Sequence, residues 1–192
     1  MIVGLLLAAG GARRFGSQKL VTPIRGKPLV RHAADLLERT TDSVVAVIGS
    51  DAPTVRAALD GTRAEIVENP EWREGLSTSL RYGVASVSPN TEAVIVALAD
   101  QPDVQPDIVR RLVDVWRDSG RSIVTARYRG VRAPPVLLSR AVFADIAELV
   151  GDVGAKAIMD RHPESVGYVD VDEDVPPDID SPGDAVAADR RN

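Results

Sequence analysis

The sequence predicts an α/β fold in which a mostly parallel sheet lies between two layers of helices. Short apolar runs alternate with amphipathic stretches along the chain, which is typical of a series of βαβ units. The chain has 192 residues and 44% of them are hydrophobic, enough for one generous α/β domain with its own core. No internal repeat interrupts the alternation, so we expect a single domain over residues 1–192.

Four apolar runs are predicted to be buried strands, because they are rich in valine and isoleucine and are bounded by glycine, aspartate or serine. They span residues 2–9, 43–48, 93–99 and 122–126. Residues 64–67 and 166–171 are weaker strand candidates. The first run has no positively charged segment before it and is far too short to span a bilayer, so it indicates a strand and not a signal peptide.

Apolar residues at helical spacing predict amphipathic helices between the strands. The three stripes are Leu29, Ala33, Leu36 and Leu37; Leu76, Leu80, Val84 and Val87; and Ile108, Leu112 and Trp116. Further helices are expected over residues 52–59, 140–149 and 155–160. Together with the strands, these helices predict a Rossmann-like three-layer α/β/α sandwich.

The last part of the chain, residues 171–192, is predicted to be a connection over the surface that ends in a short helix. Its first half is acidic and contains two adjacent prolines, which is typical of an irregular, solvated segment. Ser181 can cap the helix, Pro182 suits the first helical position, and Asp184 stands where an acid favours the exposed amides.

Charge and cysteine content exclude several classes of function. The formal net charge of -5 argues against a nucleic acid or a membrane surface as partner, because both attract a positive field. Any basic site must therefore be local. The chain has no cysteine, which excludes disulfides, thiolate metal sites and cysteine nucleophiles, and this is compatible with a reducing cytoplasm, where we expect the protein.

The segment "LAAGGARRFGSQKL", residues 7–20, follows the first predicted strand and combines adjacent glycines with basic residues. A loop at the carboxyl end of a parallel strand is where open α/β sheets bind ligands. Adjacent glycines let backbone amides approach an anion, and basic side chains add countercharge, so a polyphosphate is the expected ligand. The spacing fits neither a Walker loop nor GxGxxG. The structural alternative is a glycine-rich turn with solvated basic side chains.

These residues resemble the LAAGxSxRxGxxK signature of the nucleotidyltransferase-A-like family, and are closest to its molybdenum cofactor cytidylyltransferases. Four further segments resemble family segments in family order: "NPEWREGLSTSL" (69–80), "ADQP" (99–102), "GDVGAK" (151–156) and "DIDSPGD" (178–184). Two positions depart from the pattern. Ala12 replaces the usual serine of the loop, and residues 133–135, Ala-Pro-Pro, stand where relatives often carry a Gly-His-Pro-like turn.

The resemblance implies that the protein transfers CMP from CTP to the terminal phosphate of molybdopterin and releases pyrophosphate. The implied catalytic residues are Lys19 against the α-phosphate, Arg14 on the leaving pyrophosphate, and Asp100, which emerges where strand 93–99 ends. Arg13 is equally well explained as a solvated surface charge. Mg²⁺ is the implied cofactor, with Asp100 and Asp180 as its ligands and Asp178 as a surface acid. The implied nucleotide-binding residues are Leu7, Ala8, Ala9, Gly10, Gly11, Arg14, Lys19, Gly75, Ser77, Ser79 and Asp100.

The implied partners are the small molecules CTP and a molybdopterin-type acceptor, together with a molybdenum hydroxylase or its chaperone. Three other functions compete with this interpretation. A guanylyltransferase of the same cofactor usually carries LAGG and a GDxP-like motif, whereas this chain has Ala-Ala-Gly and Ala-Asp-Gln-Pro. A nucleotidyltransferase for another small phosphorylated acceptor, such as a sugar phosphate, usually needs more chain. A silent nucleotide-binding chaperone would not need Lys19, Asp100 and Asp180 together.

Overall fold

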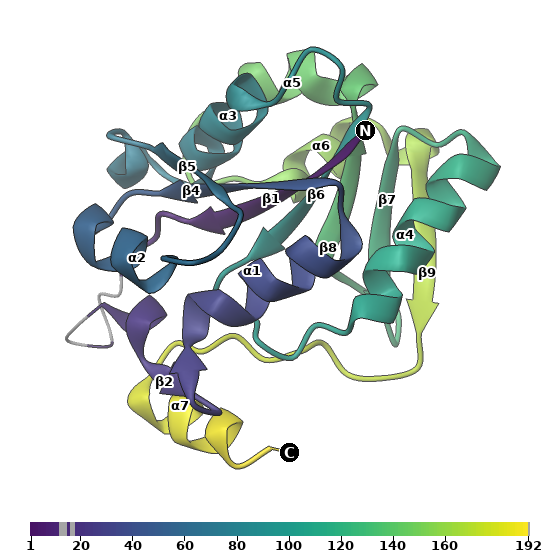
Figure 1. The fold of residues 1–192 in the computed structure, drawn as a ribbon. Helices are drawn as coiled ribbons and strands as arrows, with labels where there is room; N and C mark the ends of the chain where they lie inside the picture. Colours follow the sequence, from purple (N-terminus) through teal and green to yellow (C-terminus); the bar gives the residue numbers. More distant parts are fainter. Residues whose placement is uncertain (12–14, 16–17, 192) are drawn as a thin grey trace.

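The computed structural model describes residues 1–11, 15 and 18–191. In this part of the chain, a seven-stranded sheet has the order β5-β4-β1-β6-β8-β7-β9 (Figure 1). Every pairing is parallel except those of β8, which is antiparallel to both β6 and β7, so the predicted mostly parallel sheet is confirmed. The strands are β1 (Ile2–Ala8), β4 (Ser43–Ile48), β5 (Glu65–Glu68), β6 (Ala93–Leu98), β7 (Ile123–Tyr128), β8 (Val131–Ser139) and β9 (Val166–Val171).

Helices cover both faces of the sheet, as the three-layer prediction requires (Figure 1). On one face lie α1 (Leu29–Thr40), α2 (Ala52–Ala58) and α4 (Pro106–Ser119). On the other face lie α3 (Leu76–Ser86), α5 (Phe143–Ala147) and α6 (Ala155–Arg161). Side chains alternate along β1, so that Ile2 and Leu6 join the first core while Leu5 and Leu7 join the second.

Within the seven-stranded sheet, β8 is the strand that the sequence did not predict, and two adjacent prolines stand within it. Proline has no N–H to donate to a neighbouring strand, so a central strand is an unexpected place for it. The pairing with β7 shifts at this point: Thr125 pairs with Val136, whereas Ala126 pairs with Ala133. Pro134 and Pro135 fall in the resulting irregularity, where the ladder does not require their missing donors. Residues 133–135 therefore belong to a strand and not to a turn.

The C-terminal helix α7 (Pro182–Asp189) begins where the sequence predicted. Ser181 Oγ accepts a hydrogen bond from Asp184 N at 3.2 Å, and Asp184 Oδ2 accepts one from Ser181 N at 2.8 Å, which together form a capping box. The helix lies beside a small hairpin made by β2 (Pro23–Ile24) and β3 (Lys27–Pro28), as Figure 1 shows at the lower end of the molecule. Arg25 links the two, since its backbone N donates to Asp189 Oδ1 at 2.5 Å.

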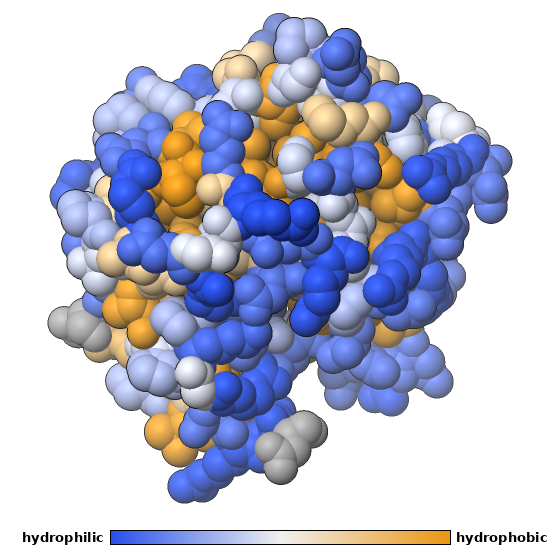
Figure 2. Space-filling view, viewed as in Figure 1, coloured by the Kyte–Doolittle hydropathy of each residue, from blue (hydrophilic) through white to orange (hydrophobic). Residues whose placement is uncertain are grey.

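The face of the molecule drawn in Figure 2 is mostly hydrophilic, with apolar residues in separate patches. Among the helices of the described residues, none has the length and apolar character that crossing a membrane requires.

Candidate active site

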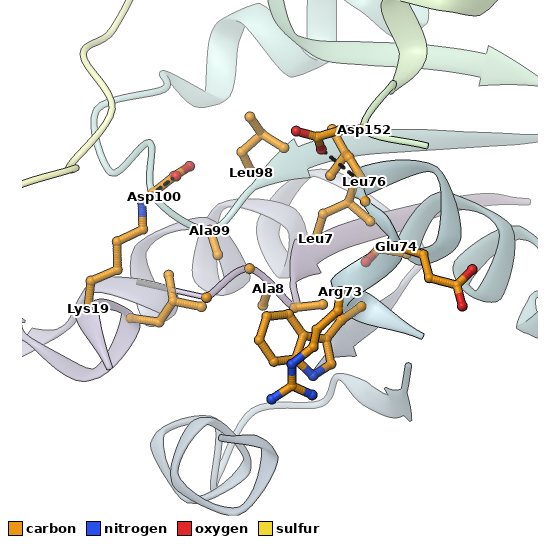
Figure 3. A pocket seen from close by; sticks show the side chains of 17 residues that line it. Leu7, Ala8, Lys19, Arg73, Glu74, Leu76, Leu98, Ala99, Asp100 and Asp152 are labelled. Atoms are coloured by element: carbon orange, nitrogen blue, oxygen red, sulfur yellow. Dashed lines mark hydrogen bonds and ion pairs between the residues drawn. The ribbon is translucent and has the colours of Figure 1, made fainter. Parts of the chain in front are cut away.

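A cavity of about 470 Å³ opens at the carboxyl ends of β1 and β6 (Figure 3). This is the edge at which parallel α/β sheets bind their ligands. Three stretches far apart in the sequence form most of its wall: the end of β1 with the glycines that follow, the segment before and within α3, and the end of β6. The lining residues are Leu7, Ala8, Ala9, Gly10, Gly11, Lys19, Leu20, Trp72, Arg73, Glu74, Gly75, Leu76, Ser79, Leu98, Ala99, Asp100 and Asp152.

Lys19 lies between two carboxylates at one side of the cavity. Its Nζ is 2.8 Å from Asp100 Oδ2 and 2.9 Å from Asp180 Oδ1. The side chain of Lys19 is 12% exposed, that of Asp100 23% and that of Asp180 41%, so the group opens to solvent on the Asp180 side. Figure 3 shows the lysine side chain reaching across to Asp100.

Local structure explains how Lys19 and Asp100 come together. Lys19 starts a short 3-10 turn, η1 (Lys19–Val21), whose preceding residue Gln18 accepts from Leu20 N and donates its side-chain amide to Ser50 O at 2.8 Å. Asp100 follows the last residues of β6, and the backbone N of Ala99 donates to Leu7 O. Lys19 is thus anchored beside the end of β4, and Asp100 follows the end of β6, with β1 between these two strands in the sheet.

Asp180 reaches the same point because the chain returns to the sheet after the acidic connection. The backbone N of Ile179 donates to Asp100 O at 3.0 Å, and the Ile179 side chain is fully buried. Gln101 adds a second link, since its Nε2 donates to Asp178 Oδ1 at 2.7 Å. The capping box of α7 then holds the residue that follows Asp180. These contacts position Asp180 through its neighbours as well as through its own carboxylate.

The charges at this point favour a protonated lysine. Burial alone would lower the pKa of Lys19, but the carboxylates of Asp100 and Asp180 outweigh it and raise the pKa above its ordinary value. The two carboxylates also offer hard oxygen donors that face one point, the chemistry that Mg²⁺ or Mn²⁺ prefers. The described residues contain no group of three or more metal-ligating side chains, so a cation here would complete its shell with phosphate oxygens and water.

Two of the segments that resemble family segments, residues 69–80 and residues 151–156, lie across the cavity from Lys19 and pack directly against each other. Gly75 has a φ of +115°, and a Cβ there would lie 2.5 Å from the carbonyl of Gly151. Ser77 N donates to Gly151 O at 3.3 Å, and Leu76 N donates to Asp152 Oδ1 at 3.2 Å. Asp152 therefore caps the start of α3 from a distant part of the chain, as the dashed line in Figure 3 marks.

The predicted binding residues differ in where the structure places them. Gly75 and Ser79 line the cavity, as do all the predicted residues from Leu7 to Gly11. Ser77 does not line it: its side chain is fully buried and its Oγ has no hydrogen-bond partner in the described part of the chain. Arg14 lies outside the described residues, as does Arg13.

Eight residues that line the cavity were not predicted as site residues: Leu20, Trp72, Arg73, Glu74, Leu76, Leu98, Ala99 and Asp152. Trp72 is held by glycines of two loops, because a Cβ at Gly11 or at Gly49 would come within 3 Å of its side chain. The Arg73 guanidinium lies 4.2 Å from the centre of the Trp72 ring and forms no ion pair with any described residue. The sequence signal for Arg73 was its position next to Trp72 in residues 69–80, a segment that resembles a family segment.

The chain is similar to several known proteins. Residues 4–166 match the model of a family described as the MobA-like NTP transferase domain. Nicotine blue oxidoreductase from Paenarthrobacter nicotinovorans is 32% identical over 191 residues, which cover 94% of this chain and 92% of that protein. A probable molybdenum cofactor guanylyltransferase from Pyrococcus horikoshii is 26% identical over 153 residues, which cover 79% of this chain and 74% of that protein.

A solved structure extends the likeness to the whole chain. The crystal structure of Rv0371c from Mycobacterium tuberculosis H37Rv superposes with a TM-score of 0.85 at 34% identity, covering 100% of this chain and 99% of that one. A second crystal structure of Rv0371c, a complex with manganese, gives a TM-score of 0.81.

Proposed function

The chain belongs to the MobA-like NTP transferase family, and from this premise we propose that it transfers CMP from CTP to the terminal phosphate of molybdopterin and releases pyrophosphate. Membership of this family supports nucleotidyl transfer as the class of reaction. The choice of CTP and of a molybdopterin acceptor is the proposal. We expect the reaction in the cytoplasm, where nucleoside triphosphates are available.

The observation that carries the proposal is the position of Lys19 between Asp100 and Asp180 at the edge of a cavity lined by adjacent glycines. In the proposed reaction, an acceptor phosphate oxygen attacks the α-phosphorus of CTP. The new P–O bond forms as the bond to the bridging oxygen breaks, and pyrophosphate leaves with that electron pair. Both partners are anionic, so the work of the protein is to position them and to neutralise charge.

The residues of the site divide this work among them. The Lys19 ammonium meets the negative charge that builds on the α-phosphate, and the backbone of Gly10 and Gly11 receives the outer phosphates. Arg14 is assigned to the leaving pyrophosphate on the resemblance alone.

Asp100 and Asp180 would hold a divalent cation, for which Mg²⁺ is proposed. Such a cation supplies charge neutralisation between the phosphate oxygens when bound. The manganese complex of Rv0371c supports a divalent cation in a related protein.

CTP is favoured over GTP by the Ala-Ala-Gly sequence at residues 8–10 and by "ADQP" at residues 99–102. A pocket sized for a pyrimidine leaves a purine clashing or its polar edge unpaired, which is worth roughly a few kcal/mol. The molybdenum cofactor is favoured by the relative from P. horikoshii, whose name gives that cofactor as its acceptor. A molybdenum hydroxylase or its chaperone is then the expected recipient of the product.

The test is pyrophosphate release by the purified protein with molybdopterin, Mg²⁺ and each of the four nucleoside triphosphates in turn. We expect release with CTP and little with GTP. Comparable turnover with both nucleotides would contradict the cytidylyltransferase assignment. Tight CTP binding without any release, with every acceptor tried, would favour the nucleotide-binding chaperone instead.

An oxidoreductase is the second candidate function, because a relative that carries that name matches 94% of this chain. The charged group of Lys19, Asp100 and Asp180 has no evident part in hydride transfer, whereas phosphoryl chemistry uses all three. Oxidation of NADH or NADPH with nicotine blue as the acceptor tests this candidate directly. A rate that survives substitution of Lys19 would support the redox reaction against nucleotidyl transfer.

A further inference from the structure

Asn69 is a fully buried amide whose hydrogen bonds are all accounted for within the described residues. Its side chain lies next to α3 and is 1% exposed as a residue. Its Oδ1 accepts from the backbone N of Glu71 at 2.9 Å. Its Nδ2 donates one hydrogen bond to Thr78 Oγ1 at 2.8 Å and another to Ser79 Oγ at 3.0 Å. Both amide protons are therefore used.

These contacts fix which way round the amide lies. A backbone N–H can only donate, so the atom of Asn69 that faces Glu71 N must be the oxygen. The nitrogen then faces the two hydroxyls, and each hydroxyl must accept from it. The backbone N of Asn69 donates in turn to Ile48 O at 2.8 Å, which anchors the whole group to the end of β4.

The two hydroxyls differ in what they do with their own protons. Thr78 Oγ1 lies 2.9 Å from the backbone carbonyl of Gly75 and 3.2 Å from that of Glu71, so its proton has a backbone acceptor. Ser79 Oγ finds no acceptor for its proton among the described residues. Ser79 is 3% exposed and lines the cavity. The wall of the cavity thus presents one hydroxyl whose lone pair is already engaged and whose proton is not.

We propose that Asn69 is a positioning residue that makes Ser79 a hydrogen-bond donor to the nucleobase, so that this wall selects a base with an acceptor atom at that point. This inference rests on the proposed function, since it takes the ligand to be a nucleoside triphosphate. Cytosine offers two such acceptors, its carbonyl oxygen and its ring nitrogen. A base edge with only N–H groups there would leave two donors facing each other, a buried and unpaired arrangement.

The first experiment compares Ser79→Ala with the matched variant Thr78→Val, which removes the neighbouring hydroxyl from the same amide. Calorimetry measures the Kd for CTP and for ribose 5′-triphosphate, a probe that has the sugar and phosphates but no base. Ser79→Ala should weaken CTP about tenfold, as expected for one unmet hydrogen bond, and leave the base-free probe unchanged. Thr78→Val should leave both affinities unchanged, although it too removes a partner of Asn69.

The second experiment tests whether Asn69 acts through Ser79. In Asn69→Asp, the two carboxylate oxygens can only accept, so the Ser79 proton is drawn to the acid and away from the cavity. This variant should also weaken CTP about tenfold and spare the base-free probe, and it should add nothing further to Ser79→Ala in the double variant. If the buried aspartate prevents Asn69→Asp from folding, Ser79→Ala still tests whether Ser79 donates a hydrogen bond to the base.

The outcomes distinguish a failure of the proposed function from a failure of the roles proposed for Ser79 and Asn69. If the parent protein binds neither CTP nor any other nucleoside triphosphate, the proposed function fails. If it binds CTP and Ser79→Ala binds equally well, or loses affinity equally for the base-free probe, then Ser79 is no donor to the base and the inference alone is overturned. Additive losses in the double variant would show that Asn69 does not act through Ser79.

Discussion

Asp100 and Asp180 stand far apart in the sequence, yet both hold the same atom: Lys19 Nζ lies 2.8 Å from one carboxylate and 2.9 Å from the other. A backbone hydrogen bond from Ile179 N to Asp100 O brings the two acidic residues together independently of their side chains. The ammonium therefore bridges two acids that would otherwise repel each other. Lys19 serves the folded structure and, in the proposed reaction, the α-phosphate.

We predict that Lys19→Ala loses about 10²–10³-fold in transfer rate, because it removes a preorganised charge aimed at the transition state. It also leaves two facing acids unneutralised, so the melting temperature should fall in EDTA and recover when Mg²⁺ is added. Pyrophosphate release and thermal unfolding measure the two effects. Lys27→Ala is the matched control, because Lys27 pairs with Asp35 outside the cavity and should change neither. If Lys19→Ala reacted at the parental rate, residues 7–20 would be better explained as a glycine-rich turn with solvated basic side chains.

Arg73→Gln should weaken CTP binding several-fold more than CMP binding. The guanidinium lies over the Trp72 ring, and the same ring is in contact range of Gly11, so the charge stands beside the loop proposed for the outer phosphates. Calorimetry with CTP and CMP measures the difference. Arg110→Gln, an exposed position on α4, is the control and should change neither affinity. Equal losses for CTP and CMP would assign Arg73 to the base or the sugar.

Much of the fold could be predicted because strands and helices follow local patterns. The apolar run of β6 ends just before Asp100, so the sequence alone indicated an acid at the carboxyl edge of the sheet. β8 escaped prediction because its prolines are tolerated only through a shift in pairing with β7, which is a property of the partner strand. Sequence reasoning could not foresee such a property from the proline pair itself.

The site was predictable to a smaller extent, because its remaining contacts join distant loops. Asp180 entered only through the family resemblance, since no local pattern says that an irregular connection returns to β6. Trp72 meets Gly11 and Gly49 in space, and nothing in its own segment indicates those partners. Asp152 caps α3 although 76 positions separate it from Leu76. Contacts of this kind depend on the sheet order, which local periodicity does not determine.

Gly75→Ala should destabilise the protein by more than the about 1–2 kcal/mol that a left-handed backbone costs a residue with a side chain. The added Cβ would meet the backbone of Gly151 at 2.5 Å, and backbone atoms cannot rotate away as a side chain does. Gly151→Ala is the matched control, because Gly151 also has a positive φ of +78° but no atom within 4 Å of its Cβ position. Urea unfolding measures both. Equal losses of unfolding free energy in the two variants would mean that the close contact between Gly75 and Gly151 does not contribute to stability.

Asp180→Asn and Asp100→Asn should share one phenotype: a raised Mg²⁺ requirement and a large loss of transfer rate, with little change in melting temperature. The substitution removes a formal charge and nearly preserves shape. The segment stays docked, because Ile179 N still donates to Asp100 O and the capping box of α7 does not use the Asp180 carboxylate. Transfer rates over a Mg²⁺ titration, with melting temperatures measured alongside, provide the test.

The alternative role of Asp180 is to complement the amino-terminal dipole of α7, which is worth under about 1 kcal/mol and nothing in catalysis. Ser181→Ala separates the two roles, because it removes the N-cap hydroxyl of α7, at about 0.5–2 kcal/mol, while Asp184 Oδ2 still accepts from the backbone N of Asp180 and of Ser181. It should lower the melting temperature and leave the Mg²⁺ requirement as in the parent. If Asp180→Asn behaves like Ser181→Ala while Asp100→Asn alone fails at limiting Mg²⁺, then the cation is held by Asp100, phosphates and water, and Asp180 belongs to the helix and to Lys19.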